Sequence, residues 1–322
     1  MKILSPKIIE DEILNNYLEY QYLFVEFQSK FLSDLHYKYQ STEDGNLALY
    51  FLKNTHQDIL RQKDYDFNFN ISYEKFWENY NVINPRRNSL GKIEESTLLP
   101  KETVRRKILK LIKKKVLNSK KRNIGWLPNE KNREIYKSET DAEIYNVCKL
   151  LGYIYKKINL SISKEEITKD VKEKFSFYWF HYLGTQLEYF RLWKKQLNDL
   201  ELVFIFMQAV KLFTSKEKEK NVSHKNLYDD PGFLKESVSS SIGVTSIAEI
   251  TGIPRATCVR KLEILVKLKM LSKNKISKRY YIIPNTIKED LASREITKRV
   301  VKLFSNFFFI CSKTINSKIQ NQ

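Results

Sequence analysis

Residues 252–271 have the sequence GIPRATCVRKLEILVKLKML, in which apolar and basic side chains recur with the period of an α-helix. One face of this helix would be a buried stripe made of Cys258, Leu262, Leu265 and Val266. Its first turns instead carry positive charge, behind a proline, on Arg255, Arg260 and Lys261. A helix N-terminus is already electropositive because of the macrodipole, so this charge is locally unfavourable. The pattern therefore indicates a negatively charged external partner.

Residues 98–117, LLPKETVRRKILKLIKKKVL, repeat this pattern at a fixed offset of 154 residues. The matched pairs are Pro100 and Pro254, Thr103 and Thr257, Arg106 and Arg260, and Lys107 and Lys261. The apolar stripe recurs as Val104, Ile108, Leu111 and Ile112. Each copy continues into a basic segment and a hydrophobic one ending in Pro-Asn, NSKKRNIGWLPN (118–129) and SKNKISKRYYIIPN (272–285). The same order of features twice indicates a duplicated unit.

The similarity extends beyond these segments. GNLALYFLKN (45–54) parallels LELVFIFMQAV (200–210), and a further helical segment follows each Pro-Asn, at 141–158 and 293–315. A period of about 155 residues is too long for a solenoid repeat and is typical of a duplicated domain. We therefore predict two homologous halves, 1–159 and 160–322, packed through long aromatic helices as a pseudo-dimer.

The composition favours a mainly α fold, because only 8 Gly and 7 Pro occur among 322 residues. Each half is expected to hold a helical segment and a small β wing. The predicted organisation is an N-terminal helical segment (1–88), a first repeat (89–130), a central helical, dimerisation-like segment (131–237), a second repeat (238–287) and a C-terminal helix (288–322). Residues 15–39 and 175–210 are dense in aromatic side chains and should form core helices. The polar stretch 214–237 should be a mobile loop.

In the second repeat, TSIAEITG (245–252) predicts a short helix with Ile247, Ala248 and Ile250 facing inward. Gly252 would form the turn, and the small residues Ala248 and Gly252 would let two helices approach closely. The first repeat has Glu94 and Leu98 at these two positions. Its helix packing or its turn is therefore expected to differ.

A short helix, a turn, a second helix and two strands around a basic loop resemble a winged helix-turn-helix. GIPRATCVRKLEIL is similar to the recognition helix of the cyclic-AMP receptor protein family and of MarR-like regulators. PKETVRRKIL matches the Ser-Arg-Glu-Thr-Val-x-Arg run of the receptor-protein family more closely. The resemblance covers 89–130 and the corresponding part of the second half. It implies a DNA-binding module without that family's nucleotide-binding β-roll, because the flanking sequence has helical period and little glycine.

The positive charge is concentrated in these two repeats. The chain has a formal net charge of +19. Residues 100–122 hold eleven Lys and Arg against Glu102, and residues 254–279 hold nine against Glu263. The two segments thus contribute +10 and +8, and the remaining sequence is nearly neutral. This concentration predicts that the repeats bind a polyanion, and the resemblance makes double-stranded DNA the expected partner.

The resemblance assigns base contacts in the major groove to Lys101, Glu102, Arg106, Arg255, Ala256 and Arg260. Arg and Lys favour guanine, whereas Glu102 can accept from cytosine, so two non-identical half-sites are expected. Phosphate or wing contacts are predicted for Thr103, Arg105, Lys107, Lys120, Lys121, Arg122, Thr257, Lys261, Lys275, Lys278 and Arg279. The alternative for Thr103 and Thr257 is a local hydrogen bond to the backbone. Trp126 and Tyr280 are expected to pack on the wings, and Cys258 in the core.

The predicted function is a sequence-specific transcription regulator without enzymatic activity, cofactor or bound metal. A plasmid-type replication initiator with tandem winged-helix domains is the alternative. A nuclease or recombinase is disfavoured, because no acidic metal-site cluster or glycine-rich phosphate loop occurs. The MarR-like resemblance leaves room for a small-molecule effector that no residue identifies. A monomer is expected, because two such units in one chain would imitate the usual homodimer of regulators. A cytoplasmic protein is expected, because Cys148, Cys258 and Cys311 are widely separated and form no CxxC pair. The apolar run 202–213 is too short to span a membrane and is interrupted by Lys211.

Overall fold

The computed structural model describes residues 4–160, 162–219, 241–282 and 291–319. This described part is mainly helical, as predicted, and contains two small antiparallel sheets of two strands each. The first helices are α1 (Pro6–Asn15), α2 (Tyr17–Tyr39), α3 (Thr42–Tyr65), α4 (Tyr73–Asn79), α5 (Leu90–Thr97) and α6 (Lys101–Lys113). The later ones are α7 (Glu130–Lys157), α8 (Lys164–Glu173), α9 (Phe175–Leu197), α10 (Leu200–Glu219), α11 (Val244–Thr251), α12 (Arg255–Lys267) and α14 (Leu291–Ile319). Among the described residues, none of these helices has the length and apolar character needed to cross a bilayer.

The chain divides into two compact units, each assembled from segments that are distant in the sequence. Lobe 1 comprises Met1–Ile9, Glu43–Lys195 and Leu303–Gln322, and lobe 2 comprises Glu10–Thr42 and Gln196–Lys302. The first repeat lies in lobe 1 and the second repeat in lobe 2. The lobes do not coincide with consecutive halves of the sequence, because α2 belongs to lobe 2 whereas α8 and α9 belong to lobe 1.

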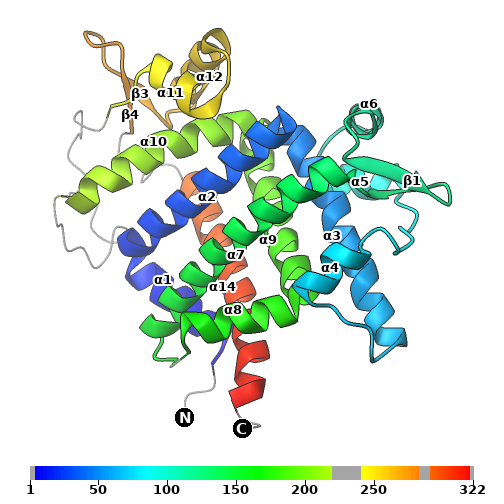
Figure 1. Cartoon of the computed structure of the whole chain (residues 1–322). Coiled ribbons are helices and arrows are strands. Elements are labelled where there is room, and N and C mark those ends of the chain that lie inside the picture. The colour runs from blue at the N-terminus through cyan, green and yellow to red at the C-terminus, as the bar shows by residue number, and fades with distance from the viewer. Residues whose placement is uncertain (1–3, 161, 220–240, 283–290, 320–322) are drawn as a thin grey trace. The chain divides into compact units, whose positions relative to one another are not determined.

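Lobe 2 is built on α2 and α10, which lie side by side (Figure 1). Both helices are rich in apolar and aromatic residues, and buried hydrogen bonds of 2.9 and 3.1 Å join Ser29 of α2 to Gln208 of α10. The second repeat packs on this pair through α11 and α12. Helix α10 continues to Glu219, so the loop predicted at 214–237 is helical at its start. The rest of that stretch lies outside the described residues.

Lobe 1 has an aromatic core centred on α9, as predicted from the composition of that segment. The side chains of Trp179, Tyr182 and Phe190 are almost fully buried. His56 of α3 stacks on Phe76 of α4 with ring centroids 4.4 Å apart. The stack continues from Phe76 to Trp126 of the first repeat, at 6.2 Å. This cluster ties the first repeat to the helical core of its lobe.

The two repeats have the same local structure at the 154-residue offset. Helices α5 and α6 correspond in length and position to α11 and α12. The turn between the helices is also the same, because Leu98 (φ 51°) and Gly252 (φ 67°) are both left-handed. Their backbone N–H groups donate to Glu94 O and Ala248 O, respectively. Of the two differences expected for the first repeat, in helix packing or in the turn, the one in the turn does not occur, since Leu98 adopts the conformation that usually favours glycine.

The buried side of α11 differs in one respect from the expectation. Ile247 is fully buried, as predicted, and Ala248 is half-buried, whereas Ile250 is 51% exposed. The buried face of this two-turn helix is formed by Ile247 and Thr251, which are four residues apart. Ile250 lies to the side of that face, so its prediction as an inward residue is wrong.

Each repeat ends in a β-hairpin. In the first, β1 (Leu117–Lys120) pairs with β2 (Asn123–Trp126), and the two turn residues Lys121 and Arg122 both have positive φ. In the second, β3 (Ser272–Lys273) pairs with β4 (Tyr280–Tyr281), and Ile242 forms a bridge to Tyr280. Trp126 and Tyr280 are each only 1% exposed, which confirms that they pack beneath the hairpins.

Candidate nucleic-acid interface

Helices α6 and α12 each have one buried and one exposed face. Val104, Ile108 and Leu111 of α6 and Cys258, Leu262 and Leu265 of α12 are buried, as predicted for the repeated stripe. The residues predicted to contact bases are all exposed, namely Lys101, Glu102, Arg106, Arg255, Ala256 and Arg260. Because helix periodicity separates the two sets, the first turns of both helices are free to approach a partner.

The exposed face carries few internal ion pairs. Lys101 lies 3.8 Å from Glu94, and Arg105 lies 3.5 Å from Glu102, and all four side chains are exposed. Exposed pairs of this kind contribute only about 0–1 kcal/mol and are readily exchanged. Within the described part of the chain, Arg106, Arg255 and Arg260 have no hydrogen bond or ion pair through their side chains. Their guanidinium groups are available to an external acceptor.

Thr103 and Thr257, the matched threonines, are both half-buried. Neither hydroxyl makes a hydrogen bond to a described residue, so the local backbone bond considered as their alternative is not observed. Arg105 of α6 is exposed. Their assignment to phosphate contacts remains a prediction.

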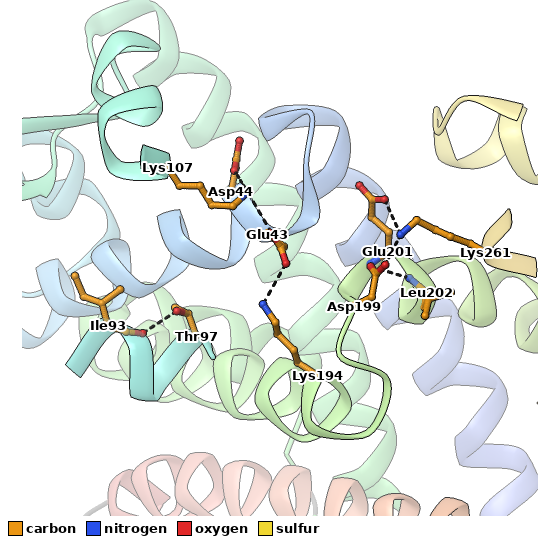
Figure 2. A network of polar contacts seen from close by, with 10 residues as sticks. All are labelled: Glu43, Asp44, Ile93, Thr97, Lys107, Lys194, Asp199, Glu201, Leu202 and Lys261. Carbon is orange, nitrogen blue, oxygen red and sulfur yellow. Dashed lines mark hydrogen bonds and ion pairs between the residues drawn. The ribbon is translucent and has the colours of Figure 1, made fainter. Parts of the chain in front are cut away.

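Lys107 and Lys261, also matched in the two repeats, are directed into the protein and not toward solvent. Figure 2 shows each of them among carboxylates of its own lobe. The Lys107 side chain is 14% exposed and that of Lys261 is 7% exposed. A buried ammonium that is paired with two carboxylates cannot also bind a phosphate without breaking those pairs. Both lysines are therefore occupied by internal ion pairs, and neither is free for the phosphate contact predicted from the sequence.

The first of these networks, the Lys107 cluster, consists of Lys107, Glu43, Asp44, Lys110 and Lys194. Lys107 Nζ donates to Asp44 Oδ1 at 2.6 Å and lies 3.2 Å from Glu43 Oε2. Lys110 reaches Asp44 Oδ2 at 2.5 Å, and the buried Lys194 reaches Glu43 Oε1 at 3.1 Å. Burial of Asp44 opposes its ionisation, but the hydrogen bonds from Lys107 and Lys110 outweigh burial and hold the pKa of this carboxyl below its ordinary value.

The second network, the Lys261 cluster, consists of Lys261, Asp199 and Glu201. Lys261 Nζ donates to Asp199 Oδ2 and lies 3.1 Å from Glu201 Oε2. Asp199 Oδ1 also accepts hydrogen bonds from the backbone N–H groups of Glu201 and Leu202, at 2.8 and 3.4 Å. Asp199 thus caps the N-terminus of α10, where a carboxylate is stabilised by free N–H groups and by the helix dipole. Its orientation toward Lys261 is fixed by this cap.

The acidic members of both clusters were not among the predicted site residues. Glu43 and Asp44 lie in the first turn of α3, and Asp199 and Glu201 lie at the start of α10. These are the two helices whose sequences, 45–54 and 200–210, parallel each other. The acidic residues at the start of each helix can be recognised in the sequence. Their pairing with a lysine 62 or 63 residues away is shown only by the structure.

The hairpins present most of the predicted wing residues to solvent. Lys121, Arg122, Lys275 and Lys278 are exposed. Lys120 Nζ donates to the carbonyl groups of Asn81 and Val82 at 2.6 and 2.8 Å, and Arg279 donates to Ser241 O at 2.8 Å. Both side chains keep further N–H groups for an external acceptor. Their first role in the fold is to hold the hairpin against the preceding chain.

Comparison of the chain with family models, with curated proteins and with solved structures gave no match. Among the described residues, no group of three or more His, Cys, Asp and Glu side chains could hold a metal ion. The interpretation of the basic faces therefore depends on the chemistry of their own residues.

Proposed function

We propose that the chain is a sequence-specific double-stranded DNA-binding protein that regulates transcription, with α6 and α12 as the recognition helices of two winged helix-turn-helix units. One observation carries this proposal. In two segments 154 residues apart, the same amphipathic helix buries its apolar stripe and exposes basic side chains within its first two turns, followed by a basic hairpin. Exposed cations on a helix that is narrow enough for the major groove match what duplex DNA requires.

The exposed residues favour base contacts that differ between the two units. Arg106 and Arg260 occupy equivalent positions and each can bind guanine O6 and N7 with two hydrogen bonds. The two preceding pairs are unequal, because Lys101 and Glu102 stand where the second unit has Arg255 and Ala256. We expect two related but non-identical half-sites within one asymmetric inverted site.

Selection of bound sequences from a pool of random duplexes tests this function. The wild-type chain should select a motif with two halves. Arg106→Ala and Arg260→Ala should each relax one half, with a loss of about 1–3 kcal/mol of discrimination at a single base pair. Lys149→Ala is the matched control, because Lys149 is an exposed cation on α7, outside both repeats.

The outcomes separate base recognition from general attraction. A wild-type chain that binds duplexes without any selected motif would show that the repeats attract DNA only through charge. Equal relaxation of both halves by either arginine variant would contradict the assignment of one half-site to each repeat. A chain that binds no duplex at physiological salt would remove the proposed function altogether.

A further inference from the structure

We propose that the carboxylates Glu43, Asp44, Asp199 and Glu201 are positioning residues that set the orientation of the two recognition helices, acting through Lys107 and Lys261. This inference rests on the proposed function. Its first support is that the two lysines are matched at the 154-residue offset and that both are removed from solvent by a pair of carboxylates. The arrangement occurs in each lobe separately (Figure 2). Its carboxylates lie at the N-terminal ends of α3 and α10, two helices whose sequences resemble each other.

The second support is the chemistry of the buried position. An apolar side chain would fill this position at a lower desolvation cost than a charged pair, so the pair is poorly explained as a device for stability alone. Ion pairs with hydrogen bonds depend on the direction of the bond, whereas the hydrophobic effect is non-directional and depends mainly on the area buried. A lysine bonded to fixed carboxylates therefore fixes the rotation of its helix about the helix axis.

The third support is the place of each lysine in its helix. Lys107 directly follows Arg106, and Lys261 directly follows Arg260. Neighbouring residues on an α-helix are about 100° apart around the axis. Holding the lysine against the scaffold consequently directs the adjacent arginine outward. Because small errors in position weaken a two-bond contact with a base edge, base preference should be more sensitive to the cluster than total affinity is.

The two clusters differ in redundancy. In the Lys107 cluster, Lys110 and Lys194 also bind the two carboxylates, so Asp44 keeps a partner when Lys107 is replaced. In the Lys261 cluster, Lys261 is the one lysine or arginine among the described residues that forms ion pairs with Asp199 and Glu201, and His36, whose pKa is lowered by burial, adds only a charge interaction with Glu201. The second recognition helix should therefore lose its orientation more readily than the first.

The test measures base preference in Lys261→Met, Lys261→Arg and Glu201→Gln by selection from the random duplex pool. Lys261→Met should lower the preference about tenfold at the base pair that Arg260→Ala identifies, with the other half-site unchanged. Lys261→Arg should restore it, because the guanidinium can bind the same carboxylates. Glu201→Gln should relax the same base pair although it removes a negative charge, a change that would by itself favour DNA. Lys298→Met, at an exposed position of α14 outside both repeats, is the matched control and should leave the motif unchanged.

Two results would overturn the positioning role while leaving the proposed function intact. One is an unchanged motif in both Lys261→Met and Glu201→Gln, with the wild-type motif present. The other is a uniform loss of affinity in Lys261→Met with a smaller salt dependence, which would show that Lys261 contacts a phosphate. Circular dichroism and urea unfolding accompany each variant, and Glu201→Gln provides the test if Lys261→Met does not fold. Absence of duplex binding by the wild-type chain would instead refute the proposed function itself.

Discussion

At the scale of single residues, the two helix–helix turns show how the same backbone conformation is reached with different side chains. A residue with a Cβ atom costs about 1–2 kcal/mol in the left-handed region, and glycine avoids this cost. Gly252 adopts φ 67°, and a Cβ atom added there would have no heavy atom within 4 Å. Glycine is therefore favoured at this position by the backbone conformation and not by a lack of space. Leu98 adopts φ 51° and retains that strain.

These two positions should respond to substitution in opposite directions. Gly252→Ala should lower the free energy of unfolding by about 1 kcal/mol, and Leu98→Gly should raise it by about 0.5–1 kcal/mol as the strain is relieved. Gly91→Ala is the control, because Gly91 lies in α5 with open space around it and should gain about 0.5 kcal/mol from helix propensity. Urea unfolding followed by circular dichroism measures all three. A neutral Leu98→Gly would mean that contacts of the leucine side chain offset the strain.

A second residue-scale effect concerns His56, which is fully buried. Neither ring nitrogen has a hydrogen-bond partner among the described residues, and the ring stacks on Phe76. Burial lowers the pKa of His56 from 6.5 to about 3. Between these pH values the unfolded chain binds a proton at His56 that the folded chain excludes. The contribution of His56 to the free energy of unfolding is therefore fully present above pH 6.5 and is lost as the pH falls toward 3.

The His56 contribution should lower the free energy of unfolding by about 2 kcal/mol between pH 7 and pH 5, at roughly 1.4 kcal/mol per pH unit once the unfolded histidine titrates. His56→Leu should reduce this slope, and the difference between the two chains isolates His56 from His36 and His181, whose pKa values burial also lowers. Urea unfolding at several pH values provides the measurement. Parallel pH profiles for the two chains would exclude His56 as the source.

At the scale of elements, periodicity predicted the helices of both repeats because their apolar stripes are local features of the sequence. The orientation of the matched lysines could not be predicted in the same way. Lys107 and Arg106 look alike in a basic run, and only the folded position of α3 shows that Lys107 points inward. Likewise, the aromatic faces of α2 and α10 indicate burial but do not identify each other as partners. Which segments of the chain form each lobe is therefore decided by tertiary packing and could not be predicted from the sequence pattern.

The second hairpin combines charge with an exposed apolar side chain at its tip. Ile276 is 94% exposed between Lys275 and Lys278. Asn274 Oδ1 accepts from the backbone N–H groups of Ile276 and Ser277, both at 2.9 Å, which fixes the tip. An apolar side chain held in this way can be buried against sugars or base edges when the basic residues beside it meet phosphates.

The two kinds of tip residue should be distinguished by the salt dependence of duplex binding. Lys275→Ala should weaken binding to all sequences alike and lower the slope of log affinity against log salt by about one. Ile276→Ala should weaken binding severalfold and leave the slope unchanged. The substitution removes buried apolar area but no phosphate contact, so the number of counterions released on binding stays the same. Fluorescence anisotropy titrations at several salt concentrations measure both. Equal slopes for Lys275→Ala and the wild-type chain would place the second hairpin away from the DNA backbone.

At the scale of the whole molecule, the proposed function has a consequence for stoichiometry, because one polypeptide carries both repeats. Regulators that bind inverted sites commonly supply the second unit from another subunit, as closed two-fold symmetry requires. Here the second unit is covalently linked, so binding of one repeat raises the effective concentration of the other at the adjacent half-site. A single chain should then achieve the avidity of a dimer. Because the two repeats differ in their exposed residues, the two half-sites would differ in sequence, and the chain would bind the site in one orientation only.

This linkage predicts that a monomer protects both half-sites together. Footprinting of the selected duplex should show two protected regions about one helical turn apart, with centres separated by roughly 10–10.5 base pairs. Sedimentation analysis of the complex should give one chain per duplex, and Arg106→Ala should weaken protection of both halves because avidity is shared. Protection of a single half-site by one chain would contradict the linked arrangement. Protected sites that occur as iterated origin repeats, and not upstream of promoters, would favour replication initiation over transcription regulation, because both activities need the same pair of helices and differ in the DNA on which they act.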